Sequence, residues 1–245
     1  MAVLESARPM QRYSPRDIIV LGAIAALLVW SLTRSRGQTW EEFGLSIVAL
    51  VIAVTFHEFA HAFVALRLGD TTAKMLGRVS LNPIRHLDLF GSLAFLFVGF
   101  GWGKPVPINP YNMRGISPTV GYAISALAGP ASNVLLAFLV TIPFRFDMLT
   151  MTSLSPLAIE FAQDLIMVNI LLAAFNFLPI PPLDGFSFAR LFLPAHVSAW
   201  LEQYGMFVLI ALVFLPQFLG RQFDLLSMLT GPLRTVIRSL VFYGM

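Results

Sequence analysis

Apolar residues fall in long runs along this chain, with short polar stretches between them. A helix needs about 20 consecutive apolar residues to cross the hydrocarbon core of a membrane. Six segments meet or approach that length, and they are 18–32, 43–66, 119–144, 157–178, 199–219 and 223–242. The pattern therefore predicts an all-α, multi-pass membrane protein with about six transmembrane helices.

The last of these segments has the weakest pattern, because it contains Gly231, Pro232, Arg234 and Arg238. It fits a kinked span, and it also fits a helix that lies in the interface with both arginines reaching the headgroups. Five spans therefore remain an alternative to six.

Composition agrees with a membrane protein and excludes an ordinary soluble domain. Hydrophobic residues make up 57% of the chain and charged residues 12%, about half of the roughly 25% that is usual in soluble domains. The mean hydropathy is +0.78. Since no hydrophilic run is long enough for an added soluble domain, we expect one membrane-embedded domain over 1–245, with its core at about 43–190 and accessory membrane segments at 199–245.

The distribution of positive charge predicts the orientation. Arg8, Arg12 and Arg16 precede the first apolar run, and further Lys and Arg residues concentrate in the loop 67–118. Cytoplasmic loops carry such an excess, so we expect a cytoplasmic N-terminus, with this loop on the same side of what we take to be the cell membrane. The sequence 33–36 offers no small-x-small cleavage pattern, so the first run is expected to be a retained span.

The central motif is His57-Glu58-Phe59-Ala60-His61, inside the second apolar run. Residues four apart share one face of a helix, so both imidazoles can bind one cation while Glu58 reaches a water molecule beside it. Zinc suits these ligands best. Ionisable residues inside a span are costly and usually functional, which argues against a mere pair of buried histidines.

A catalytic zinc usually takes three protein ligands, and the chain contains no cysteine. Glu160 and Glu202 fall at unsuitable depths, whereas Asp184 follows a proline-rich stretch, 179–182, that cannot be regular helix. We therefore predict Asp184 as the third ligand of one zinc ion per chain. The alternative is that Asp184 only caps the helix that follows it.

The long loop after the second run holds apolar patches too short for a span. We expect short strands, such as a β-hairpin, or a re-entrant segment there. His86 and Asp88 lie in this loop beside Arg85 and are expected to hydrogen-bond the loop together rather than bind metal.

Three motifs together resemble the site-2 protease family of intramembrane zinc metalloproteases. They are HEFAH at 57–61, AGPASN at 128–133 and NFLPIPPLDG at 176–185, in the order and spacing of that family. The resemblance covers about 43–190 and is closest to compact members, since there is no room for a PDZ or CBS domain.

The resemblance implies that His57, His61 and Asp184 bind zinc and that Glu58 is the catalytic base. It implies that Asn133 helps to hold the substrate carbonyl or oxyanion, with Asn176 as a weaker candidate for substrate contact. It also implies that an extended substrate pairs with a hairpin edge, for which the candidate residues are Pro105, Val106 and Pro107. The implied partner is another membrane-spanning protein, cleaved in or near its transmembrane segment during regulated intramembrane proteolysis.

These parts predict a zinc metalloendopeptidase in which Glu58 takes a proton from the attacking water and passes it to the leaving amine. We expect no nucleic-acid partner, while a second copy of the chain or an adaptor protein remains open. The main alternative is a zinc-binding or transport protein without proteolytic activity. A transporter usually has paired broken segments in its two halves, and such a pair is not evident here.

Overall fold

The computed structural model describes residues 39–88, 91, 103–146, 148, 154–219 and 224–243. This part of the chain is mostly helical. Its helices are α2 (Trp40–Arg67), α3 (Thr72–Met75), α5 (Pro118–Arg145), α6 (Pro156–Asn176), α7 (Asp184–Ala189), α8 (Ala195–Leu219) and α9 (Leu225–Val241), with short 3-10 helices η1 (Pro83–Arg85) and η2 (Pro110–Asn112).

Four of the described helices are long and apolar enough to cross a membrane, namely α2, α5, α6 and the Ala195–Phe214 part of α8. They coincide with the second to fifth predicted spans. The first predicted span, 18–32, lies outside the described residues. The sixth prediction corresponds to α9, whose 17 residues do not reach the length of a span, so six transmembrane helices are not confirmed.

Local sequence signals explain where the three central helices begin. At the start of α2, the Thr39 hydroxyl accepts a hydrogen bond from the Glu42 backbone N–H, and the Glu42 carboxylate accepts one from the Thr39 N–H. This reciprocal pair satisfies two N–H groups that would otherwise lack partners. At the starts of α5 and α6 the Ser117 and Ser155 hydroxyls accept hydrogen bonds from the Val120 and Ala158 backbone N–H groups. Each serine is followed by a proline in the first turn, where the missing N–H leaves no intrahelical hydrogen bond unmade.

Helices α2, α5 and α6 form the centre of the molecule, and each of the three contacts the other two. Their contact faces are rich in small residues, which allow close approach of helix backbones in membranes. The fully buried examples are Ala49, Ala53, Ala62, Ala65, Ala137, Ala173 and Ala174. Many large apolar side chains, such as Phe63, Leu135 and Leu171, face outward instead, as expected of a surface that contacts lipid.

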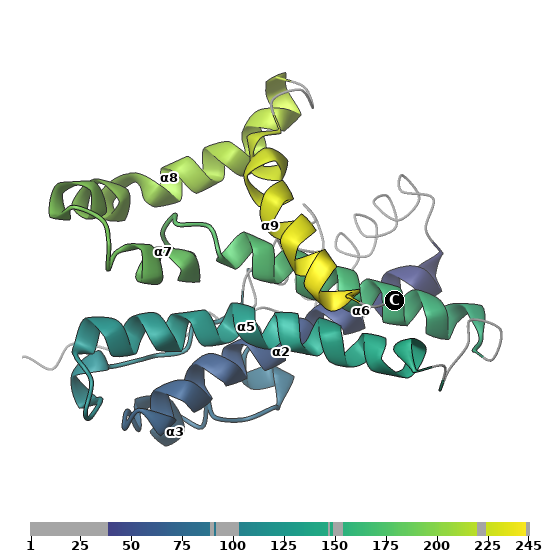
Figure 1. Cartoon of the computed structure of the whole chain (residues 1–245), viewed down its shortest axis with the longest axis horizontal. Coiled ribbons are helices and arrows are strands. Elements are labelled where there is room, and N and C mark those ends of the chain that lie inside the picture. The colour runs from purple at the N-terminus through teal and green to yellow at the C-terminus, as the bar shows by residue number, and fades with distance from the viewer. Residues whose placement is uncertain are drawn as a thin grey trace, which may run out of the picture.

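The remaining helices surround this centre unevenly. In Figure 1, α9 crosses α6 obliquely, and α8 lies apart from α2 and α5. Ile237 and Val241 bury α9 against α5 and α6, and α8 approaches the proline-rich stretch at Gly205, where an added Cβ would lie 2.7 Å from Pro181 Cδ. The amphipathic α9 therefore packs on the bundle while its Arg238 stays exposed.

The predicted β-hairpin is not confirmed in the part of the loop that the structure describes. There the extended pairing is a single antiparallel bridge between Leu87 and Gly103, supported by a hydrogen bond from Lys104 N–H to the His86 carbonyl. Residues 92–102, which the hairpin would include, are not among the residues that the structure describes. The bridge nevertheless brings the two ends of this stretch together beside α2.

Candidate metal centre

The two motif histidines lie on the buried face of α2 and meet edge to face. Their ring centroids are 4.6 Å apart with an interplanar angle of 87°. Their exposed fractions are 5% and 6%, so neither imidazole is in free contact with solvent. The four-residue spacing of His57 and His61 thus produces the shared face that the sequence predicts.

Asp184 joins them from the start of α7, after the proline-rich stretch that follows α6. Its Oδ2 atom is 3.0 Å from His57 Nε2 and 3.3 Å from His61 Nε2. All three candidate ligand atoms lie within 4.8 Å of one another. Gly185 makes this approach possible, because a Cβ at that position would lie 2.2 Å from the Phe177 carbonyl oxygen.

Hydrogen bonds at the far side of each ring fix the position of the ring proton. His57 Nδ1 lies 2.6 Å from Asn133 Oδ1, and His61 Nδ1 lies 2.7 Å from the Ser125 carbonyl oxygen. Since both partners are acceptors, each Nδ1 carries the proton and donates it. In the neutral rings both Nε2 atoms are therefore left with a lone pair that faces Asp184.

The site consequently places three acceptors against one another in a buried space. Asp184 Oδ2 has no hydrogen-bond partner among the described residues although it is buried. Two nitrogen lone pairs and a carboxylate oxygen repel each other unless a proton or a metal cation lies between them. Two imidazoles and one carboxylate form a ligand set that suits zinc and leaves a coordination position open, so the residues fit one zinc ion.

Gly129 of α5 lets that helix pass directly beneath the two rings. A Cβ at this position would lie 2.4 Å from His61 Nε2 and 2.7 Å from His57 Cε1. Both distances are far inside van der Waals contact, so no side chain fits there without moving a candidate ligand. The glycine of the AGPASN motif therefore forms one wall of the metal centre.

Glu58 is half-buried next to the histidines and faces the loop that starts at Gly103. A Cβ built on Gly103 would lie 3.1 Å from Glu58 Oε1. Arg78 holds this loop, because its guanidinium donates hydrogen bonds to the carbonyl oxygens of Lys104 and Pro105. Burial lowers the pKa of Arg78 while the charge of Glu58 opposes that shift, which means that a buried cation lies near the predicted base.

The same loop is anchored to the end of α2 by Asp70, which is fully buried. Its carboxylate accepts hydrogen bonds from the Thr72 hydroxyl and backbone N–H, from the Asn112 amide and from the Asn109 N–H. Burial raises the pKa of the Asp70 carboxyl, but these hydrogen bonds outweigh burial and hold that pKa below its usual range. Asp70 thus fixes the loop that carries Pro105 and Val106.

The other titratable residues considered from the sequence lie away from the metal group. Glu202 pairs with Arg190 at 2.9 Å, and Glu160 is at the opposite end of α6. His86 Nε2 bonds the Ser80 carbonyl at 2.6 Å, and Asp88 accepts from the Gly91 N–H at 2.8 Å. The last two residues thus bond within their loop, as the sequence predicts.

Asn133 and Asn176 occupy different surroundings. Asn133 is fully buried and uses its oxygen for His57 and its amide for the Ala53 carbonyl. Asn176 is half-buried at the end of α6 and donates to the Leu172 carbonyl one turn earlier. The substrate contacts expected of both residues, and of Pro105, Val106 and Pro107, stay predictions.

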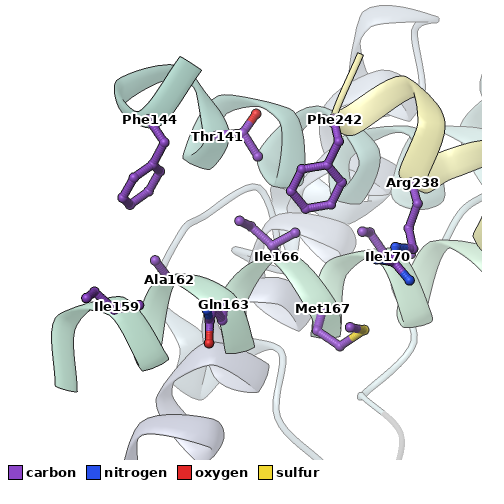
Figure 2. A pocket seen from close by; sticks show the side chains of 10 residues that line it. All are labelled: Thr141, Phe144, Ile159, Ala162, Gln163, Ile166, Met167, Ile170, Arg238 and Phe242. Carbon is purple, nitrogen blue, oxygen red and sulfur yellow. The ribbon is translucent and has the colours of Figure 1, made fainter. Parts of the chain in front are cut away.

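A cavity of about 310 Å³ lies between α5, α6 and α9, away from the metal group. Its lining is mostly apolar, with Ile166 and Met167 on α6 and Phe242 after α9, and Arg238 points from α9 toward α6 (Figure 2). None of the three candidate ligands lines it, so this cavity is separate from the candidate active site.

Sequence reasoning missed two residues that shape the metal centre. Asn169 of α6 bonds Asn133 at 2.7 Å, and Arg78 has the contacts described above. A signal for Asn169 was present, because an asparagine inside an apolar span usually has a hydrogen-bonding role. Gly129 belongs to a quoted motif, but its contact with the rings depends on how α5 crosses α2.

Curated proteins similar to this chain are named putative zinc metalloproteases. YwhC of Bacillus subtilis is 38% identical over 177 residues, which cover 69% of this chain and 80% of YwhC. Rip2 of Mycobacterium tuberculosis strain H37Rv is 29% identical over 225 residues, which cover 86% of this chain and 81% of Rip2. No family model matches the chain, and no solved structure matches it.

Proposed function

Because this chain belongs to the zinc metalloprotease family that includes YwhC and Rip2, we propose that it is an intramembrane metalloendopeptidase of the site-2 protease type. The observation that carries the proposal is the group formed by His57, His61 and Asp184. Two of its members lie on a helix long and apolar enough to cross a membrane. His57 precedes the end of that helix at Arg67 by roughly 15 Å, so the reaction takes place below the membrane surface.

Zinc, when bound by these three residues, polarises the scissile carbonyl and makes the attacking water more acidic. Glu58 acts as the general base, taking a proton from that water and passing it to the departing amine. Its half-buried position beside the first histidine suits this role. Asn133 holds the His57 ring in the orientation that binds metal.

The loop from Gly103 to Pro107 provides the surface on which an extended substrate segment aligns. This loop passes next to Glu58, and Arg78 fixes its carbonyl groups at Lys104 and Pro105. An extended substrate next to it would gain main-chain hydrogen bonds, as in strand addition. A substrate helix has to unwind locally first, because its peptide bonds are otherwise hidden within the helix.

The proposed substrates are membrane-spanning proteins cut within or near a transmembrane segment, as in regulated intramembrane proteolysis. The positive charge of the N-terminal segment and of the loop 67–118 supports a cytoplasmic N-terminus and a site open to that side of the cell membrane. Under this proposal 18–32 adds another span. A second copy or an adaptor would help to select substrates.

A zinc-binding protein without proteolytic activity is the competing function, and Glu58 distinguishes the two. The test compares wild type with Glu58→Gln, His57→Ala and Asp184→Asn, all purified in detergent, for zinc content and for cleavage of a reconstituted transmembrane substrate. We expect about one zinc per chain in wild type and in Glu58→Gln, with cleavage in wild type alone. Zinc without cleavage in wild type, or full cleavage by Glu58→Gln, would refute the protease proposal.

A further inference from the structure

A buried asparagine on α6 ends a chain of hydrogen bonds that starts at the metal centre. Asn169 is fully buried, and its amide nitrogen donates to the Leu165 carbonyl at 2.8 Å. Because a carbonyl can only accept, this bond fixes which end of the Asn169 amide is nitrogen. The Asn169 oxygen must then face α5, where it lies 2.7 Å from Asn133 Nδ2.

The orientation of Asn133 follows from that contact. Its amide nitrogen donates to Asn169 Oδ1 and, at 3.1 Å, to the Ala53 carbonyl of α2. With both hydrogens used, the Asn133 oxygen remains for His57 Nδ1, 2.6 Å away. A side-chain acceptor on α6 and a backbone acceptor on α2 thus determine together which end of this amide meets the histidine.

We propose that Asn169 is a positioning residue of the metal centre, which acts through Asn133 to keep His57 in the tautomer whose free Nε2 faces Asp184. The proposal rests on the proposed zinc site. If the Asn133 amide were reversed, it would present N–H groups to His57 Nδ1. The ring would then carry its proton on Nε2 and point an N–H at the position of the metal, where a lone pair is needed.

The reversed amide also lacks partners on its other side. Its oxygen would face Asn169 Oδ1 and the Ala53 carbonyl, and three buried acceptors without a hydrogen repel one another. Asn169 therefore adds a specific penalty against the tautomer that cannot bind metal. Simple association of helices through an amide pair would explain the contact between α5 and α6, but it would not require this order of donors and acceptors.

The experiment measures zinc affinity of the full chain in detergent by competition with a chelator, together with the visible spectrum of the cobalt-loaded protein, which reports ligand geometry. Asn169→Leu removes the acceptor. Asn169→Asp retains it, because a protonated carboxyl can donate to the Leu165 carbonyl and still accept from Asn133. Thr141→Val is the matched control, since it removes a different buried polar group, the α5 hydroxyl that is bonded to the Phe138 and Val241 carbonyls.

We expect Asn169→Leu to weaken zinc binding about tenfold or more, as is usual when a partner of a metal-bound histidine is removed, and to change the cobalt spectrum. Asn169→Asp should restore most of the affinity, and Thr141→Val should match wild type. Asn169→Ala, which adds no volume, gives the same comparison if the leucine variant does not fold.

The inference is refuted if folded Asn169→Leu and Asn169→Ala bind zinc as wild type does. An equal loss of affinity in Thr141→Val would refute it too, because the effect would then reflect general loosening of the bundle. Failure of wild type to bind zinc would instead overturn the proposed function, so the two failures can be told apart.

Discussion

Replacing Gly129 by alanine tests whether α5 shapes the metal centre. The new Cβ would lie 2.4 Å from His61 Nε2, 2.5 Å from His61 Cε1 and 2.7 Å from His57 Cε1. Neither ring can turn away freely, since the Nδ1 atoms of both are hydrogen-bonded to α5, one through Asn133 and the other through the Ser125 carbonyl. The substitution therefore pushes α5 and α2 apart or moves a candidate ligand.

The size of the displacement follows from the contact distances. Ordinary contact between such atoms begins at 3.4 Å, so the ring and the helix have to separate by about 1 Å. Metal sites tolerate deviations of about 0.2 Å in ligand distance. We expect Gly129→Ala to weaken zinc binding about 100-fold and to destabilise the fold by about 1–3 kcal/mol through overpacking.

The assay is zinc competition on purified protein, with thermal unfolding measured on the same samples. Gly44→Ala is the matched control, because Gly44 also lies in a spanning helix and a Cβ there meets nothing within 4 Å. This control should retain wild-type zinc affinity and lose no stability, since alanine favours helix over glycine. Wild-type zinc affinity in Gly129→Ala would show that α5 does not form a wall of the site.

Three further outcomes are expected. The pKa of Asp70 is lowered in the folded state, so its stabilising effect is present above the unfolded pKa of about 3.9 and is lost as the pH falls through the folded pKa. Asp70→Asn should remove this pH dependence from thermal unfolding and should lower the free energy of unfolding by about 1–3 kcal/mol at neutral pH. Arg78→Met should raise KM for a transmembrane substrate without altering zinc content. Arg85→Met, which loses a solvent-exposed hydrogen bond to the Gly77 carbonyl, should leave KM unchanged. Zinc at 100 times its Kd should stabilise wild type by about 2.7 kcal/mol but leave the unfolding midpoint of Asp184→Asn unchanged.

The sequence was sufficient to predict the described apolar helices and the group of three candidate ligands, because both depend largely on short-range patterns. A run of apolar residues reports a span directly, and His57 and His61 share a helix face whatever surrounds them. Asp184 was predictable because the prolines before it exclude regular helix and return the chain toward the depth of the motif.

The remaining features depend on how helices cross, which no local pattern encodes. The partner of Asn133 is 36 residues away on α6, so the direction of its amide became evident only with α2, α5 and α6 packed together. The sixth predicted segment shows that a local apolar pattern can also suggest a span where the structure has a shorter packed helix. Apolar residues that suggested a span belong to α9, where Ile237 and Val241 pack against the bundle and Arg234 donates to the Ser227 carbonyl.

The elements that enclose the metal centre limit the sides from which a substrate could reach it. Gly129 brings α5 against both rings, Asn133 fills the space between His57 and α6, and Asp184 covers a third face from the start of α7. The loop beginning at Gly103 borders Glu58 on a further side. A peptide bond attacked with the help of Glu58 must lie between that carboxylate and the ligand atoms, so under the proposed function the substrate arrives along this loop. The loop is held by buried charged side chains, Arg78 and Asp70, so under the proposed function it would offer the substrate a fixed edge.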